Sequence, residues 1–112
     1  MISHLGFRNL TPELSTEMAR EVSLGHASDL LSDVLANAPQ GGILVTIQVH
    51  MNVIAVAAHA GLAGVIFTTG RTPEEVVREK AVEEKIPLFV SEETTFDVVG
   101  KLYALGLRER KA

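Results

Sequence analysis

GGILVTIQVHMNVIAVAAHAGLAGVIFTTG, residues 41–70, is the stretch of sequence that decides the fold. Its first run, Ile43–Ile47, is apolar and rich in β-branched residues, as is typical of a strand buried on both faces. A small-residue helix, Val53–Ala60, follows, and Gly61 is the usual left-handed residue at a helix end. A second buried strand, Ala63–Phe67, completes the unit. Two buried strands joined by a helix are expected to lie parallel, with a right-handed crossover.

Before this unit, the pattern is weaker. Thr11 and Pro12 predict only a short helical turn, with Thr11 as its N-cap. Arg20–Leu24 predicts a first strand, and Gly25–Ala27 a turn into a helix. Ser28 is expected to cap that helix, with Asp29 in its first turn. The apolar face of the helix is predicted to hold Leu30, Leu31, Val34, Leu35 and Ala38.

After this unit, two more helices and one more strand are expected. Thr72 and Pro73 predict a helix start, with Val76, Val77, Ala81 and Val82 on its inner face. A fourth strand is predicted at Ile86–Val90, with Pro87 near its start, and a closing helix at Phe96–Leu105 before Gly106. The residues of that helix predicted to pack on the sheet are Phe96, Val99, Leu102, Tyr103 and Leu105.

The alternation predicts an α/β fold in one domain, residues 1–112. We expect a mostly parallel sheet of about four strands, with helices covering both faces. Hydrophobic residues make up 46% of the 112 residues, enough for a core, and there is no cysteine for a disulfide or a thiolate metal site. The net charge of −4 argues against a nucleic-acid binder. No signal peptide or membrane span is indicated, so a cytoplasmic location is expected.

Polar residues follow each predicted strand, where the strand enters the next helix. In a parallel sheet these loops share one rim, and open α/β sheets bind ligands there. Helix N-termini at that rim would favour a small anionic ligand. The predicted ligand-binding residues are Asp29, Gln48, His50, Asn52, Thr68, Thr69 and Gly70. A purely structural capping role is an open alternative for His50 and Asn52.

The sequence lacks the motifs that nucleotide hydrolysis, dinucleotide binding and metal binding usually require. The phosphate loop Gly-x-x-x-x-Gly-Lys-Ser/Thr is absent, and so is Gly-x-Gly-x-x-Gly after a strand. A metal site from His26, Asp29 and His50 is conceivable across the rim, but no paired histidine spacing supports it. His59 is interpreted as a structural histidine. The sequence therefore indicates no cofactor, no metal and no ATP hydrolysis.

Several segments between residues 20 and 106 resemble the DRTGG domain family. They are Ala27–Ser32, Thr46–Ala57, Phe67–Gly70, Ile86–Leu88 and Lys101–Gly106. Small stand-alone bacterial proteins of this kind carry the label serine kinase of the phosphocarrier protein HPr. The resemblance implies a fold like the N-terminal domains of HPr kinase/phosphorylase and Mur ligases, and a regulatory, ligand-sensing role. The family's Asp-Arg pair is replaced here by His50-Met51-Asn52, and its Thr-Gly-Gly by Thr68-Thr69-Gly70 or Thr69-Gly70-Arg71.

Three functions follow as alternatives. The first is a non-catalytic regulatory or ligand-binding domain, which predicts a polar pocket at the rim and no phosphorylation of HPr. The second is a scaffold or interaction subunit, which predicts an exposed apolar patch on a helix or an edge strand. The third is a small enzyme with His50 as acid or base beside a carboxylate such as Asp29. A homodimer is expected, with the small residues of Val53–Ala60 across a twofold axis, so that Ala58→Glu or Ala60→Glu would split it.

Overall fold

The computed structural model describes residues 5–18 and 21–110. One mixed sheet of five strands forms its centre, in the order β1-β5-β4-β3-β2. The strands β2 (Gly25–Ala27), β3 (Ile43–Thr46), β4 (Gly64–Phe67) and β5 (Leu88–Val90) are parallel. The fifth strand, β1 (Arg8–Asn9), pairs antiparallel with β5. The α/β class and the mostly parallel sheet are confirmed, with one strand more than predicted.

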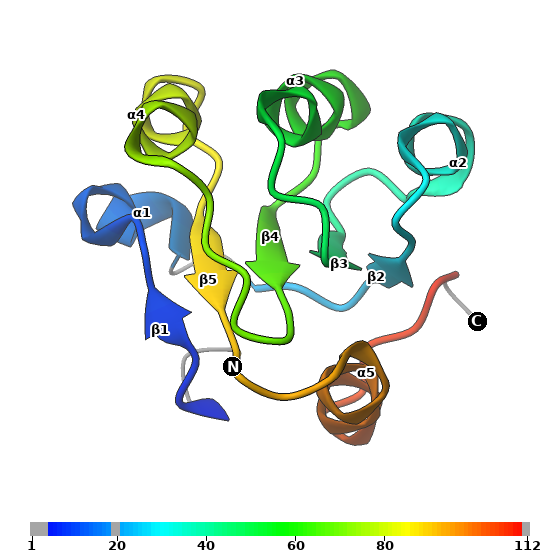
Figure 1. The fold of residues 1–112 in the computed structure, drawn as a ribbon. Helices are drawn as coiled ribbons and strands as arrows, with labels where there is room; N and C mark the ends of the chain where they lie inside the picture. Colours follow the sequence, from blue (N-terminus) through cyan, green and yellow to red (C-terminus); the bar gives the residue numbers. More distant parts are fainter. Residues whose placement is uncertain (1–4, 19–20, 111–112) are drawn as a thin grey trace.

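Helices cover both faces of the sheet, but unequally. The crossover helices α2 (Leu31–Asn37), α3 (Met51–Ala60) and α4 (Glu75–Glu83) lie side by side on one face (Figure 1). On the opposite face lies α5 (Thr95–Ala104), which packs against β2 and β3. The short η2 (Pro12–Leu14) and α1 (Ser15–Met18) lie beyond β5, near α4. None of the helices in the described residues is long and apolar enough to cross a membrane.

Two hydrophobic cores result from the alternation of side chains along each strand. The core under α2, α3 and α4 contains Leu44, Val65, Phe67 and Leu88, all fully buried. The core under α5 contains Ile43, Val45, Ile66 and Phe89, closed by Val98, Leu102 and Leu107.

The middle of the chain folds as predicted. Both strands of the central unit are buried along their whole length, and α3 ends at Gly61 with a left-handed φ of 68°. Pro87 directly precedes β5, as expected. Thr11 and Pro12 begin the short η2 turn, but the Thr11 hydroxyl accepts the Leu88 N–H at 3.0 Å instead of capping the turn.

The first predicted strand is wrong. Residues 25–27, predicted as a turn, form β2, whereas Arg20 lies outside the described residues. Leu24 makes an isolated parallel bridge with Arg108, and its carbonyl accepts the Ile43 N–H at 2.9 Å. β2 is an edge strand, and its Gly-His-Ala sequence lacks the apolar pattern that marks a buried strand.

Two predicted helix starts are also wrong. The helix α2 begins at Leu31 with Leu30 as N-cap, so Asp29 precedes it. The Ser28 hydroxyl accepts the Leu30 N–H at 3.2 Å in a local turn. The helix α4 begins at Glu75 with Glu74 as N-cap, and the Thr72 hydroxyl instead donates to the Gly70 carbonyl at 3.4 Å.

Several predicted core positions face solvent. Val34, Val77, Ala81 and Leu102 are buried as predicted. The exposed exceptions are Leu30, Leu35, Val76, Phe96, Val99, Tyr103 and Leu105. Val98 and Leu102 face the sheet, whereas Val99 and Tyr103 lie at the side of the helix, where they line a groove between α5 and β2.

Candidate functional site

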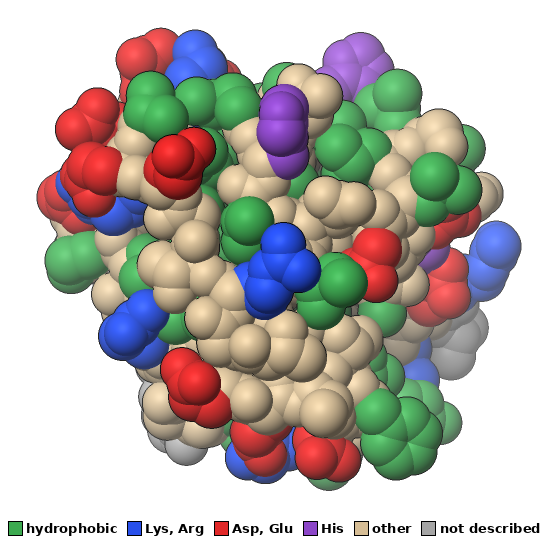
Figure 2. Space-filling model, in the orientation of Figure 1, with side chains coloured by type: hydrophobic (Ala, Val, Ile, Leu, Met, Phe, Trp, Pro, Cys, Tyr) green, Lys and Arg blue, Asp and Glu red, His purple; other side chains and the backbone are tan. Residues whose placement is uncertain are grey.

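The predicted ligand residues lie in loops at one rim, at the carboxyl ends of the parallel strands. Asp29 follows β2, His50 and Asn52 follow β3, and Thr68 and Thr69 follow β4. The strands β3 and β4 are neighbours in the sheet, so their two loops are adjacent. Figures 1 and 2 show this end of the molecule in the same orientation.

Asp29 ties the β2 loop to the β3 loop. One of its carboxylate oxygens accepts the Thr46 hydroxyl at 2.9 Å and the Ile47 N–H at 2.8 Å. The side-chain amide of Gln48 donates to the Asp29 carbonyl at 3.2 Å. Both predicted ligand residues are therefore engaged in holding two loops together.

His50 is the N-cap of α3. Its Nδ1 accepts the backbone N–H of Asn52 at 3.1 Å, which fixes the tautomer with hydrogen on Nε2. The ring and the Asn52 side chain are both exposed. Within residues 5–18 and 21–110, no carboxylate forms an ion pair with His50.

Thr68–Gly70 ties the β4 loop to the loop after β5. The Thr68 and Thr95 hydroxyls lie 2.6 Å apart, and the Gly70 N–H donates to the Ser91 carbonyl at 2.8 Å. Thr69 and Gly70 both have left-handed backbones, with φ of 57° and 70°. A Cβ on Gly70 would lie 2.6 Å from a carboxylate oxygen of Glu92, so only glycine fits there without displacing that side chain.

The loops after β4 and β5 lead to helices on opposite faces of the sheet. The three helices after β2, β3 and β4 share one face, and the helix after β5 lies on the other. Ligand crevices of open α/β sheets form where successive connections leave on opposite faces. Here the loops on either side of that point are joined by their own hydrogen bonds.

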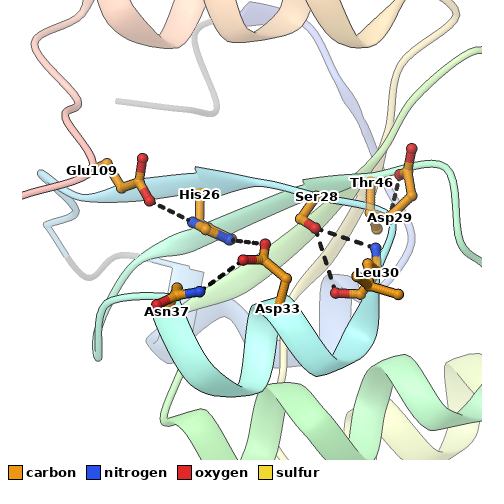
Figure 3. Close-up of polar contacts among 8 residues, drawn as sticks. All are labelled: His26, Ser28, Asp29, Leu30, Asp33, Asn37, Thr46 and Glu109. Carbon is orange, nitrogen blue, oxygen red and sulfur yellow. Dashed lines mark hydrogen bonds and ion pairs between the residues drawn. The ribbon is translucent and has the colours of Figure 1, made fainter.

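A further polar cluster, which the sequence analysis did not identify, lies at the edge strand β2 (Figure 3). The His26 ring is 9% exposed and stands between two carboxylates. Its Nε2 lies 2.8 Å from Asp33 on α2, and its Nδ1 lies 3.0 Å from Glu109 after α5. Each ring nitrogen of His26 therefore lies within hydrogen-bond distance of a carboxylate oxygen from a different segment of the chain.

Asp33 is the acid most strongly affected in this cluster. Its pKa is lowered to about 2, first by the hydrogen bond from the Asn37 side chain and then by that from His26. The Asn37 amide lies 2.8 Å from the other carboxylate oxygen. The sequence gives little indication of this cluster. His26 and Asp33 are seven residues apart, but Glu109 lies 83 residues after His26.

A groove of about 300 Å³ opens beside His26, between β2 and α5. Val45, Leu102 and Leu107 are its buried apolar residues, and Val99 and Tyr103 line it from α5. The guanidinium of Arg108 stacks 3.4 Å from the centre of the Tyr103 ring. In the described part of the chain, no three His, Asp or Glu side chains are arranged to hold a metal ion, which leaves the metal set of His26, Asp29 and His50 without geometric support.

Neither a scan against known protein families nor a search of curated proteins found a match. The resemblance to DRTGG domains therefore stays an expectation from the sequence motifs.

Proposed function

We propose that this protein is a non-catalytic interaction domain that binds another protein through the outer face of α5. The observation that carries the proposal is the exposure of large apolar side chains on this one helix. Phe96 is 87% exposed, Tyr103 58% and Val99 36%. Figure 2 shows hydrophobic side chains at the surface over α5, at the lower right. Exposed apolar residues gathered at one place are typical of protein interaction sites.

The residues at the rim support a catalytic function less than the α5 surface supports an interaction. An acid–base role for His50 needs a partner that orients or accepts its proton. Its Nδ1 is occupied by the Asn52 N–H, and the Asp29 oxygen that binds Thr46 also binds Ile47. These groups hold the protein's own loops, which favours a binding domain over an enzyme.

A small anionic or nucleotide-like ligand at the rim is the second candidate function. The specific observation in its favour is the exposed His50 ring, whose Nε2–H is left as a donor at the start of the ten-residue α3. This candidate corresponds to the regulatory role that the DRTGG resemblance implies. We extend the proposal to a fold of the HPr kinase and Mur ligase N-terminal-domain type, and to a cytoplasmic location.

Site-specific photo-cross-linking tests the interaction proposal. A benzophenone amino acid replaces Phe96 on α5 or, as a matched control, Val76 on α4, which is also apolar and 57% exposed. Irradiation in the native host is expected to give a discrete protein adduct from position 96 and none from position 76. No adduct at position 96, or equal adducts at both, contradicts the proposal.

The second candidate has its own measurement. Titration of the isotope-labelled protein with AMP is expected to shift the amide resonances of residues 48–52 and 68–71 if the rim binds anions. His50→Ala should then weaken binding without unfolding the chain, since the ring is exposed. Shifts that are absent at millimolar AMP would remove this nucleotide from consideration.

A further inference from the structure

We propose that His26 is a pH-sensitive link between α2 and residues 107–109, the segment that follows α5. While both ring nitrogens carry hydrogen, His26 holds this segment at the edge of the sheet. When the ring loses one proton, Glu109 is released and the segment becomes looser. The inference goes beyond the proposed function, because it concerns contacts within the chain rather than a partner.

Residues 107–109 lie beside the outer edge of β2, the last strand of the sheet. The Gly25 N–H donates to the Arg108 carbonyl at 2.9 Å, and the Arg108 N–H donates to the Ser23 carbonyl at 3.1 Å. Leu107 is buried in the core under α5. The first two residues of the segment are therefore held by burial and by backbone hydrogen bonds, and the third is held by its side chain.

The His26 ring stands between carboxylates from two different segments (Figure 3). Its Nε2 lies 2.8 Å from Asp33 on α2, and its Nδ1 lies 3.0 Å from Glu109. Aspartate and glutamate are ordinarily ionised near neutral pH, and they then only accept hydrogen bonds. An imidazole carries hydrogen on both nitrogens when it is protonated and on only one when it is neutral. Both contacts are therefore hydrogen bonds at the same time only in the protonated ring.

The two carboxylates are not held equally well. Asp33 belongs to α2, and its other oxygen accepts the Asn37 side-chain amide at 2.8 Å. Its side chain is 34% exposed, whereas that of Glu109 is 55% exposed and lies outside the helices and strands. A neutral ring therefore keeps its hydrogen on Nε2, towards Asp33. The lone pair on Nδ1 then faces the carboxylate of Glu109, which moves away into solvent.

Other charged groups do not replace this contact. Of the charged side chains in the described ranges, only Asp33 and Glu109 form ion pairs with His26. Arg108 is next to Glu109, but its guanidinium stacks 3.4 Å from the centre of the Tyr103 ring, and its Nη1 donates to the Tyr103 carbonyl. It is thus directed towards α5. On β3, the residue in register with His26 is a buried leucine.

The segment forms part of the wall of the groove between β2 and α5. Its three residues all line this groove, whose most buried apolar residues are Val45 and Leu102. Release of Glu109 removes a side-chain contact that holds this wall in place. The groove is therefore expected to be closed more firmly at acidic pH and more loosely at alkaline pH. The methyl resonances of Val45 and Leu102 should follow the same titration.

NMR spectroscopy of the full chain from pH 5 to pH 8, the range in which histidines ordinarily change charge, tests the link. The ring resonances report the protonation of His26, and amide hydrogen exchange at Gly25, whose N–H is bonded to the Arg108 carbonyl, reports the attachment of the segment. Protection is corrected for the intrinsic pH dependence of exchange. As His26 loses its proton, protection at Gly25 should fall about twofold to fivefold, as loss of a partly exposed ion pair allows. The Ile43 N–H, bonded to the Leu24 carbonyl on the other side of the same chain segment, is the matched control and should not respond.

Two substitutions of Glu109 test the role of the proton. The side-chain amide in Glu109→Gln can both donate and accept, so it can bond the ring in either protonation state. Protection at Gly25 should then no longer vary with pH. Glu109→Ala removes the contact, so protection should be low at every pH. His59→Gln, at an exposed site on α3, is the control variant and should keep the wild-type response. Circular dichroism checks that each variant is folded.

Three results overturn the inference. The first is a His26 ring that does not change its protonation between pH 5 and pH 8. The second is protection at Gly25 that does not follow the titration of His26. The third is a pH response that persists in Glu109→Gln. None of these measurements involves Phe96, so the link and the interaction proposal can fail independently of each other.

Discussion

The two faces of the sheet are built from the same strands but are covered in different ways. Three adjacent helices cover Leu44, Val65 and Phe67, whereas α5 alone, with flanking segments, covers Ile43, Val45 and Ile66. On the first face the crossover helices also support one another, since α3 packs against both α2 and α4. On the second face a groove opens beside α5, and apolar side chains remain exposed. Exposed apolar side chains occur over both faces, with Leu35 and Val76 on the first, but among the described residues only on α5 do they include aromatic rings.

The largest expected effect compares one leucine from each face. Leu44→Ala, under the three helices, should lower the free energy of unfolding by about 4 kcal/mol, because the enclosed site cannot collapse around the cavity. Leu102→Ala, on α5, should cost about 2–3 kcal/mol, since Leu102 lines the groove and its neighbours can relax. Urea denaturation measures both. Equal losses would mean that the two faces are equally well packed.

A smaller effect, of opposite sign on the two faces, is expected at two glycines. Gly61 ends α3 with φ of 68°, so Gly61→Ala should destabilise the protein by about 1 kcal/mol. Gly100 lies inside α5 with open space around it, and Gly100→Ala should stabilise the monomer by about 0.5–1 kcal/mol. Urea denaturation at a few micromolar protein keeps dimerisation out of the comparison. A destabilising Gly100→Ala would show that its Cβ meets an obstacle.

The smallest expected effect concerns the cluster of His26, Asp33 and Glu109 at the edge strand β2. His26 joins α2, through Asp33, to the segment after α5, through Glu109. Folding lowers the pKa of Asp33 from 3.8 to about 2, so this carboxylate stabilises the folded state above pH 3.8, and the contribution is lost as the pH falls towards 2. The stability difference between wild type and Asp33→Asn should therefore be largest near neutral pH and shrink as the pH falls from about 4 through 2.

The source of that pH dependence can be checked with a second variant. Asn37→Ala removes the strongest cause of the lowered pKa, so the folded-state pKa should rise towards 3.8 and the loss of stability with acid should become smaller and be complete at a higher pH. Thermal unfolding followed from pH 7 to pH 2 gives both curves. A difference between wild type and Asp33→Asn that does not change with pH would exclude the ion pair as its cause.

The sequence predicted the parts of the fold whose signals are local. Ile43–Thr46 and Gly64–Phe67 are continuous apolar runs, because both of their faces are covered, and such runs indicate buried strands. The end of α3 at Gly61 and the start of β5 after Pro87 were each predicted from a single residue. The rim residues were placed at the strand ends by topology alone, and the adjacency of the β3 and β4 loops agrees with that placement.

The elements that were missed depend on contacts between distant segments. The strand β1 is two exposed polar residues that pair with β5 some 80 positions later, at Arg8 with Val90 and Asn9 with Phe89. His26 acquires its surroundings from α2 and from Glu109, so Gly-His-Ala alone looks like a turn. In α5, apolar residues occur on two sides of the helix, and periodicity cannot tell which side meets the sheet. For this reason the exposed residues of α5 were predicted as core positions.

The placement of α5 has a consequence for how the chain folds as it leaves the ribosome. Each of α2, α3 and α4 is made between two neighbouring strands and can cover its own part of the sheet as soon as the second strand appears. The opposite side, with Ile43, Val45 and Ile66, must wait for Val98 and Leu102, more than 30 residues after β4 begins. The nascent chain therefore exposes one apolar side of its sheet during synthesis. This is the stage at which we expect it to be most prone to aggregation and most open to a chaperone.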